Sequence, residues 1–188
     1  NPPRPSSGHG EVLQWNHGVV SRLLDRHALL RDVDVVCGHD WLTAIAAREA
    51  ARLLWRPLVV TFHDEVTGKH AGVLGPDARF VRDVEALTAH DANHVIANSR
   101  YVAAQLTRHY GLSAERITAI PGGIDPALLD VAAPERVRDF RAPLADEHEL
   151  LVAYVGRLDP EKGMGALAEA IERVTDARRD VRFVIAGT

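Results

Sequence analysis

The sequence predicts an α/β protein made of two doubly wound domains. Two observations support this prediction. Short, β-rich apolar runs alternate along the chain with segments whose apolar residues recur at helical spacing. The alternation also occurs in two blocks, and these are separated by a stretch at 126–148 that is rich in Pro, Asp, Glu and Arg. Strands that alternate with helices at this spacing pair in parallel through right-handed crossovers, so each block predicts a parallel sheet.

The first block, residues 1–125, contains most of the elements. Helical spacing is found at 11–26, 41–56, 77–89 and 100–110, and β-rich runs are found at 33–37, 58–62, 94–98 and 117–120. Pro57 ends the second helix, whereas Ser99 and Gly111 are suited to cap the fourth. The run at 58–62 lacks apolar–polar alternation, which predicts a strand covered on both faces.

The second block is shorter. Residues 126–148 lose the alternation and are expected to form a linker with one short helix. Residues 149–188 restart it, with a strand at 150–155, a helix at 164–174 and a strand at 181–185. The chain begins without a methionine and stops where a strand enters a glycine turn, so we expect it to be an internal piece of a longer protein.

Composition narrows the class of protein. Hydrophobic residues make up 46% and charged residues 26%, as in a globular domain, and the net charge of −4 argues against a general nucleic-acid binder. No apolar run is long enough to span a bilayer, although peripheral membrane association stays open. Cys37 is the only cysteine, which excludes an internal disulfide and favours a reducing, cytoplasmic location. Within its apolar strand we expect a buried, inert thiol.

Several chemistries lack their sequence signals. The ten histidines are scattered without metal-ligand spacing, so no metal site is predicted. No GxSxG, Walker GxxxxGK[ST] or GxGxxG motif occurs, which argues against a serine hydrolase, a P-loop nucleotidase and a dinucleotide-dependent oxidoreductase. No bound cofactor is therefore expected.

Polar and glycine-bearing segments follow three of the predicted strands: Gly38–Asp40, His63–Glu65 and Gly156–Arg157. Ligands of doubly wound folds bind beyond the carboxyl ends of the strands. The third segment continues through Lys162 into a helix, where backbone amides, Arg157 and Lys162 suit a diphosphate. A solvated loop is the alternative of about equal weight.

The other two segments have competing interpretations. His63 is suited to exchange a hydrogen bond with a reacting hydroxyl, but a histidine bonded to a backbone carbonyl is favoured on sequence alone. His39–Asp40–Trp41 poses the same choice, and here Asp40 is expected to cap the helix that begins at Trp41. The glycine-bearing loop at 68–72 is able to approach a ligand closely.

Five motifs together resemble the retaining family-4 glycosyltransferases. In chain order they are DVVCGHDW at 34–41, PLVVTFH at 57–63, VIANS at 95–99, IPGGID at 120–125, and VGR through EKG at 155–163. The stretch ExxGKHxG at 65–72 is most similar to glycogen-synthase-like members. The resemblance runs from about Val33 to Thr188, most of the chain.

The resemblance implies the GT-B architecture, in which two Rossmann-like domains face each other across a cleft. It implies that a sugar moves from an ADP-, UDP- or GDP-sugar to a glucan, lipid or small-molecule acceptor. The transfer would need no metal and would retain the anomeric configuration. Residues 1–125 would be the acceptor-side domain, 126–148 the linker, and 149–188 the start of the donor-side domain.

The resemblance also assigns roles to single residues. Arg157 and Lys162 match the pair that binds the donor diphosphate, and Gly156 matches the glycine that lets the backbone approach the phosphates. His63 matches the catalytic histidine beside the transferred sugar and the acceptor. Contacts with the acceptor or the sugar are expected from five further residues, His39, Asp40, Glu65, Lys69 and His70.

The chain departs from the family pattern in three ways. Gly122 stands in the hinge-side motif where the family usually has Asn. A glycine-rich loop before residue 1 and a C-terminal segment with two spaced glutamates are missing, so both domains are expected to be incomplete and the 188 residues alone inactive. The alternatives are a nucleotide-sugar epimerase of this fold and a non-catalytic sugar- or nucleotide-binding module. The sequence does not indicate an oligomeric state.

Overall fold

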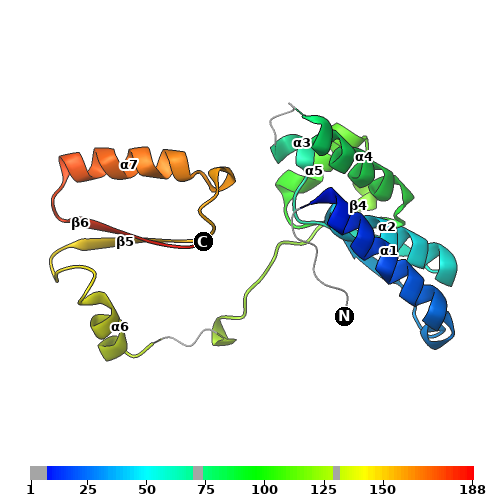
Figure 1. The fold of residues 1–188 in the computed structure, drawn as a ribbon, viewed down its shortest axis with the longest axis horizontal. Helices are drawn as coiled ribbons and strands as arrows, with labels where there is room; N and C mark the ends of the chain where they lie inside the picture. The colour runs from blue at the N-terminus through cyan, green and yellow to red at the C-terminus, as the bar shows by residue number, and fades with distance from the viewer. Residues whose placement is uncertain (1–7, 70–73, 129–131) are drawn as a thin grey trace. The chain divides into compact units, whose positions relative to one another are not determined.

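The computed structural model describes residues 8–69, 74–128 and 132–188. Contacts divide the chain into two compact units, Asn1–Gly123 (unit 1) and Ile124–Thr188 (unit 2), and the division falls inside the motif at 120–125. Both units are α/β structures with parallel sheets, as predicted (Figure 1). No helix in the described ranges combines the length and apolar character that crossing a membrane needs.

Unit 1 is built on a four-stranded parallel sheet. Its strands are β1 (Val36–His39), β2 (Leu58–Phe62), β3 (His94–Ala97) and β4 (Ile117–Ala119), paired in that order. Its main helices are α1 (His9–Arg26), α2 (Asp40–Leu54), α4 (Pro76–Asp91) and α5 (Arg100–Tyr110). Because each strand continues into a helix before the next parallel strand, all four carboxyl ends lie at one edge of the sheet.

The core of unit 1 lies on one face of this sheet. Leu58, Val60 and Phe62 of β2 are buried against α2, α4 and α5, whereas Val59 and Thr61 between them are only partly buried. Successive side chains of a strand point to opposite faces, so this alternation means that the described helices cover a single face. The prediction of a strand covered on both faces is therefore wrong for the part of the chain that the structure describes.

Strand β1 is shifted from its predicted position at 33–37. Its pairing starts where Val36 N donates to Pro57 O (2.9 Å), and it runs on to His39. Gly38 permits close packing, since a Cβ there would lie 2.9 Å from the Cβ of Ala47 on α2. Cys37 points away from this contact and is exposed, so the prediction of a buried thiol is wrong.

Local capping follows the sequence at α5. Ser99 Oγ accepts a hydrogen bond from Val102 N (3.1 Å), and Gly111 takes a left-handed conformation (φ 66°) beyond the helix end, which confirms both predicted caps.

Helix α1 is tied to α2 by Asn16, a buried side chain that the sequence did not single out. Its amide donates to Leu42 O (2.8 Å) and accepts from Ala46 N (2.8 Å).

Unit 2 contains a two-stranded parallel sheet, β5 (Leu150–Val155) with β6 (Val181–Ala186), joined through α7 (Met164–Ala177). Figure 1 shows α7 lying along this strand pair. The segment before β5 forms α6 (Pro134–Arg141). The Arg141 guanidinium donates to the carbonyl of Glu149, which connects α6 to the start of the sheet.

Candidate functional site

The carboxyl ends of β1, β2 and β3 bring together the polar residues that follow each strand. His39 ends β1, His63 follows β2 and Asn98 follows β3. The register pairs His39 with Thr61 and Phe62 with Ala97, so the three side chains lie at the same edge of the sheet. Sequence reasoning expected this convergence for His39 and His63 but did not assign a role to Asn98.

The two histidines contact each other directly. His39 Nδ1 and His63 Nε2 are 3.0 Å apart, and their rings are stacked with centroids 5.3 Å apart and an interplanar angle of 16°. One imidazole nitrogen must donate and the other accept for this hydrogen bond to form. Both side chains are exposed, so the pair can also bind a ligand hydroxyl. The favoured sequence interpretation of His63, a ring bonded to a backbone carbonyl, is wrong.

The backbone of His63 is fixed from both sides by side chains that directly follow the two neighbouring strands, β1 and β3. Asp40 Oδ1 accepts from His63 N (2.7 Å), and Asn98 Nδ2 donates to His63 O (2.7 Å). The Asp40 carboxylate therefore reaches across to the next strand and does not cap α2, which corrects the capping prediction. Asn98 Oδ1 is buried without a hydrogen-bond partner among the described residues, so this amide has one acceptor to spare.

Asp40 adopts a strained backbone to make this contact. Its φ of 49° lies in the left-handed region, which is uncommon for a residue other than glycine. Burial raises the pKa of its carboxyl above the ordinary value, and the hydrogen bond from His63 N opposes that rise. Strain of this kind gathers at functional sites, where the surrounding contacts hold it in place.

Glu65 faces the protein interior rather than the surface of the site. Its side chain is 2% exposed, and its carboxylate accepts from Thr67 N (2.8 Å), Gly68 N (2.7 Å) and the ring of His109 (Nδ1, 2.9 Å). It thus holds the short helix α3 (Val66–Lys69), which sequence reasoning missed. Burial alone would raise its pKa, but these hydrogen bonds outweigh burial and lower it.

Beneath the same loop lies a second buried carboxyl, Glu85. It is 4% exposed and accepts from Tyr110 OH (2.5 Å) and from Val66 N (3.1 Å). Burial raises the pKa of Glu85 to about 7, and burial together with this carboxyl raises the pKa of the Tyr110 phenol.

Of the remaining predicted site residues, Lys69 ends α3 and His70 lies outside the described residues.

In unit 2 the loop after β5 has the features of an anion site. Tyr154 OH donates to Arg157 O (2.8 Å), which fixes the backbone at the strand end. A Cβ on Gly156 would lie 2.9 Å from this hydroxyl, so a larger residue there would force the Tyr154 side chain to shift. The Arg157 guanidinium is 63% exposed and lies 3.5 Å from Asp159 Oδ2, a contact that orients it without burying it.

The loop then enters α7 through a hydrogen-bonded turn, in which Lys162 N donates to Asp159 O (2.9 Å) and Gly163 N donates to Pro160 O (3.0 Å). Asp159 Oδ1 accepts from Glu161 N (3.0 Å), and Gly163 joins the turn to α7 at a left-handed φ of 74°. No side chain caps the first turn of α7, and no acidic residue stands in it. The helix N-terminus beside Arg157 and Lys162 therefore favours negative charge. No group of three or more metal-ligating side chains occurs in the described chain.

Comparison with known proteins gives matches in both sequence and structure. Residues 1–128 match the sequence model of Glycosyltransferase Family 4. A glycogen synthase from Mycobacterium tuberculosis (strain CDC 1551 / Oshkosh) is 35% identical over 155 residues, which cover 82% of this chain and 35% of that protein. A D-inositol 3-phosphate glycosyltransferase from Corynebacterium efficiens is 33% identical over 168 residues, covering 83% and 38%. The chain thus spans little more than a third of the length of these relatives.

Solved structures resemble the chain over nearly all of its length. Sucrose-phosphate synthase from Thermosynechococcus elongatus has a TM-score of 0.77 at 20% identity, covering 98% of this chain and 44% of its own. HepE from Anabaena, in complex with UDP and glucose, has a TM-score of 0.70 at 22% identity, covering 96% and 45%. The catalytic domain of starch synthase IV from Arabidopsis thaliana, bound to ADP and acarbose, has 0.69 at 18%, covering 97% and 48%.

Proposed function

Since the chain belongs to Glycosyltransferase Family 4, we propose that it serves in the transfer of a sugar from a nucleotide-sugar donor to a hydroxyl acceptor, with retention of the anomeric configuration. The predicted α/β fold of the GT-B type is confirmed by the parallel sheets and the structural neighbours. Unit 1 would supply the acceptor side and unit 2 the first part of the donor side. The arrangement around Arg157 carries the proposal.

The donor diphosphate would lie on the loop after β5. Transfer breaks the bond between the sugar's anomeric carbon and the diphosphate oxygen, and the electron pair stays on that oxygen. The acceptor hydroxyl oxygen bonds to the anomeric carbon, and its proton passes to the departing diphosphate. Arg157, Lys162 and the uncapped start of α7 would stabilise the charge that develops there. Gly156, which has no side chain, would let the backbone approach the phosphates closely.

His63 would position the reacting sugar or the acceptor hydroxyl. Its ring is held by His39, and its backbone is fixed by Asp40 and Asn98. His63 therefore has little conformational freedom left to lose when a substrate binds. Glu65 would act indirectly by holding the loop that follows His63. Contacts of Lys69 and His70 with the acceptor stay predictions.

Donor and acceptor are chosen for testing by analogy. The neighbours solved with UDP and with ADP make UDP- and ADP-sugars the first donors to test, followed by GDP-sugars. The glycogen synthase relative suggests a glucan acceptor, and the inositol phosphate relative suggests a small polyol phosphate. No metal or other cofactor is invoked in this proposal.

The test is to follow each donor in the full-length protein with and without acceptor, and to identify the product anomer by NMR. We expect donor consumption only when an acceptor is present, with the configuration of the donor retained. Consumption of donor without acceptor would indicate an epimerase. Binding of the donor without any reaction, in the presence of glucan and polyol phosphate, would indicate a binding module.

A further inference from the structure

Trp55 is an exposed aromatic residue in a strained position. It follows the last residue of α2 with φ 53° and ψ 45°, the left-handed conformation that glycine usually adopts at a helix C-terminus. Its side chain is 91% exposed, so it contributes little to the core of unit 1. A tryptophan at this position therefore neither relaxes the strained backbone nor adds buried apolar surface to the fold. Such a residue points to a ligand.

Beside Trp55 lies a cavity of about 690 Å³, within the size range of small-molecule sites. Its walls come from the end of α2, from the segment entering β2 at 57–58, and from Asp91 and Asn93 between α4 and β3. These segments lie at the amino ends of the strands. The cavity is thus at the opposite edge of the sheet from His63 and is distinct from the proposed transfer site.

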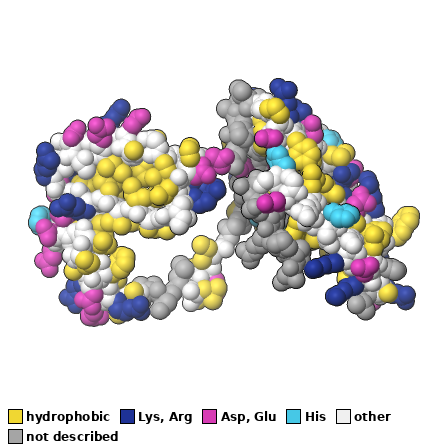
Figure 2. Space-filling model, in the orientation of Figure 1, with side chains coloured by type: hydrophobic (Ala, Val, Ile, Leu, Met, Phe, Trp, Pro, Cys, Tyr) yellow, Lys and Arg dark blue, Asp and Glu magenta, His cyan; other side chains and the backbone are white. Residues whose placement is uncertain are grey.

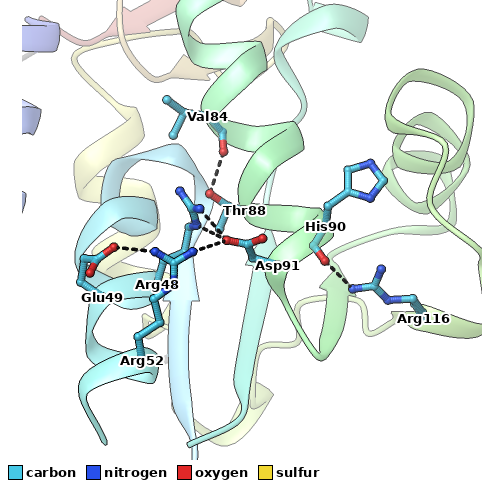
Figure 3. Close-up of polar contacts among 8 residues, drawn as sticks. All are labelled: Arg48, Glu49, Arg52, Val84, Thr88, His90, Asp91 and Arg116. Atoms are coloured by element: carbon cyan, nitrogen blue, oxygen red, sulfur yellow. Dashed lines mark hydrogen bonds and ion pairs between the residues drawn. The ribbon is translucent and has the colours of Figure 1, made fainter. Parts of the chain in front are cut away.

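The charges around the cavity are nearly balanced. Arg48 and Arg52 of α2 converge on Asp91, with nitrogen–oxygen distances of 2.5 and 3.3 Å (Figure 3). Arg52 also contacts Glu49 Oε1 at 3.1 Å. Arg56 donates to a backbone carbonyl, that of Arg31 (3.1 Å). Two carboxylates therefore offset two of the three guanidinium groups, leaving donors and acceptors side by side with little excess charge.

This combination fits an uncharged, polyhydroxylated ligand better than an anion or a nucleic acid. A sugar ring has a face of C–H groups that packs on an indole, and a rim of hydroxyls that bonds with guanidinium N–H groups and with carboxylate or amide oxygens. A phosphate ligand is bound best by several uncompensated guanidinium groups, and of the three here only that of Arg56 has no carboxylate partner among the described residues. We infer that Trp55 and the Arg48–Arg52–Asp91 cluster form a carbohydrate-binding site that is separate from the transfer site.

The test uses the emission of the 188-residue chain, which has three tryptophans, Trp15, Trp41 and Trp55. Maltoheptaose, cellohexaose and mannohexaose are titrated separately, with inorganic phosphate as the comparison. We expect at least one oligosaccharide to change the emission saturably and to protect Trp55 from iodide quenching. Trp55→Ala lacks the reporting indole, so its binding is followed by isothermal titration calorimetry beside wild type, and the substitution is expected to weaken that binding at least tenfold, while Trp15→Phe leaves it unchanged.

Trp55→Gly separates binding from folding. Glycine removes the indole and also relieves the left-handed backbone, so the melting temperature is expected to rise by about 2 °C or more while oligosaccharide binding is lost. Three results would overturn the site: no response to any of the three oligosaccharides, unchanged affinity in Trp55→Ala, or a response to phosphate alone. Because the readout is binding, failure here leaves the transferase proposal unaffected.

Discussion

Asp40 shows how one side chain supports the site at the cost of backbone strain. Replacing it with Ala would leave His63 N without its acceptor and would keep a Cβ in the left-handed region. We expect Asp40→Ala to lower the free energy of unfolding by about 2 kcal/mol. Asp40→Asn, which keeps an accepting oxygen and tolerates this conformation, should stay within about 1 kcal/mol of wild type. Denaturant unfolding followed by tryptophan emission measures both, and equal stability of the two variants would contradict this role.

Glu85 predicts a pH dependence of stability. Its pKa is raised to about 7 in the folded protein from the ordinary 4.5, so between these pH values the folded carboxyl holds a proton that the unfolded chain has released. The titration of Glu85 is therefore expected to lower the free energy of unfolding as pH rises from about 4.5 to about 7, by up to about 1.4 kcal/mol per pH unit. Asp40, whose pKa is also raised, acts in the same direction but is present in all three proteins compared below.

Glu85→Gln is expected to flatten this decline, because the side chain no longer titrates. The control is Glu115→Gln, which replaces an exposed carboxyl on unit 1. Unfolding free energies at pH 5 and pH 8 should differ by about 1–3 kcal/mol more in wild type and Glu115→Gln than in Glu85→Gln. The same pH dependence in all three proteins would show that Glu85 does not titrate in this range.

At the scale of elements, two glycines near the start of α7 should respond oppositely to alanine. Gly163 has φ 74°, so Gly163→Ala is expected to destabilise the turn and α7 by about 1 kcal/mol. Gly165 lies within the helix with open space at its Cβ, so Gly165→Ala should stabilise α7 by about 0.5 kcal/mol. Hydrogen exchange of the α7 amides measures both changes. Equal effects of the two substitutions would mean that the left-handed conformation at position 163 does not require a glycine.

At the scale of the whole molecule, unit 2 exposes much apolar surface. Figure 2 shows hydrophobic side chains gathered on one face of this unit. Leu150 and Val152 of β5 and Ile185 of β6 are among those exposed. Exposed apolar strands favour association, so we expect the 188-residue chain to self-associate as its concentration rises. Val152→Lys should reduce the mean mass in sedimentation equilibrium, whereas Thr175→Lys on α7 should not. A monomer at all concentrations would contradict this expectation.

Much of the fold was predictable because it follows local patterns. Helical spacing located α2, α4 and α5, and Ser99 and Gly111 marked the ends of α5. The one-sided covering of β2 could not be predicted, because the apolar run at 58–62 looks the same whether one face is covered or two. The exposure of Cys37 follows from the same one-sided packing.

The candidate site was predictable in position but not in its contacts. Strand ends indicated where His39, His63 and Arg157 would lie, because parallel strands share one functional edge. The pairing of Asp40 with His63 N depends on the register between β1 and β2, which the sequence does not display. The inward direction of Glu65 depends on His109, which is 44 residues away.

The most direct test of the central claim is an NMR titration of the ¹⁵N-labelled chain with UDP, ADP and GDP. We expect at least one nucleotide to shift the amides of 156–163 and the first turn of α7 most. Arg157→Ala and Lys162→Ala should each raise its Kd about 5- to 150-fold, equivalent to about 1–3 kcal/mol, whereas Arg173→Ala on α7 should leave it unchanged. Shifts that centre elsewhere, or wild-type affinity in both variants, would contradict a diphosphate site at the end of β5.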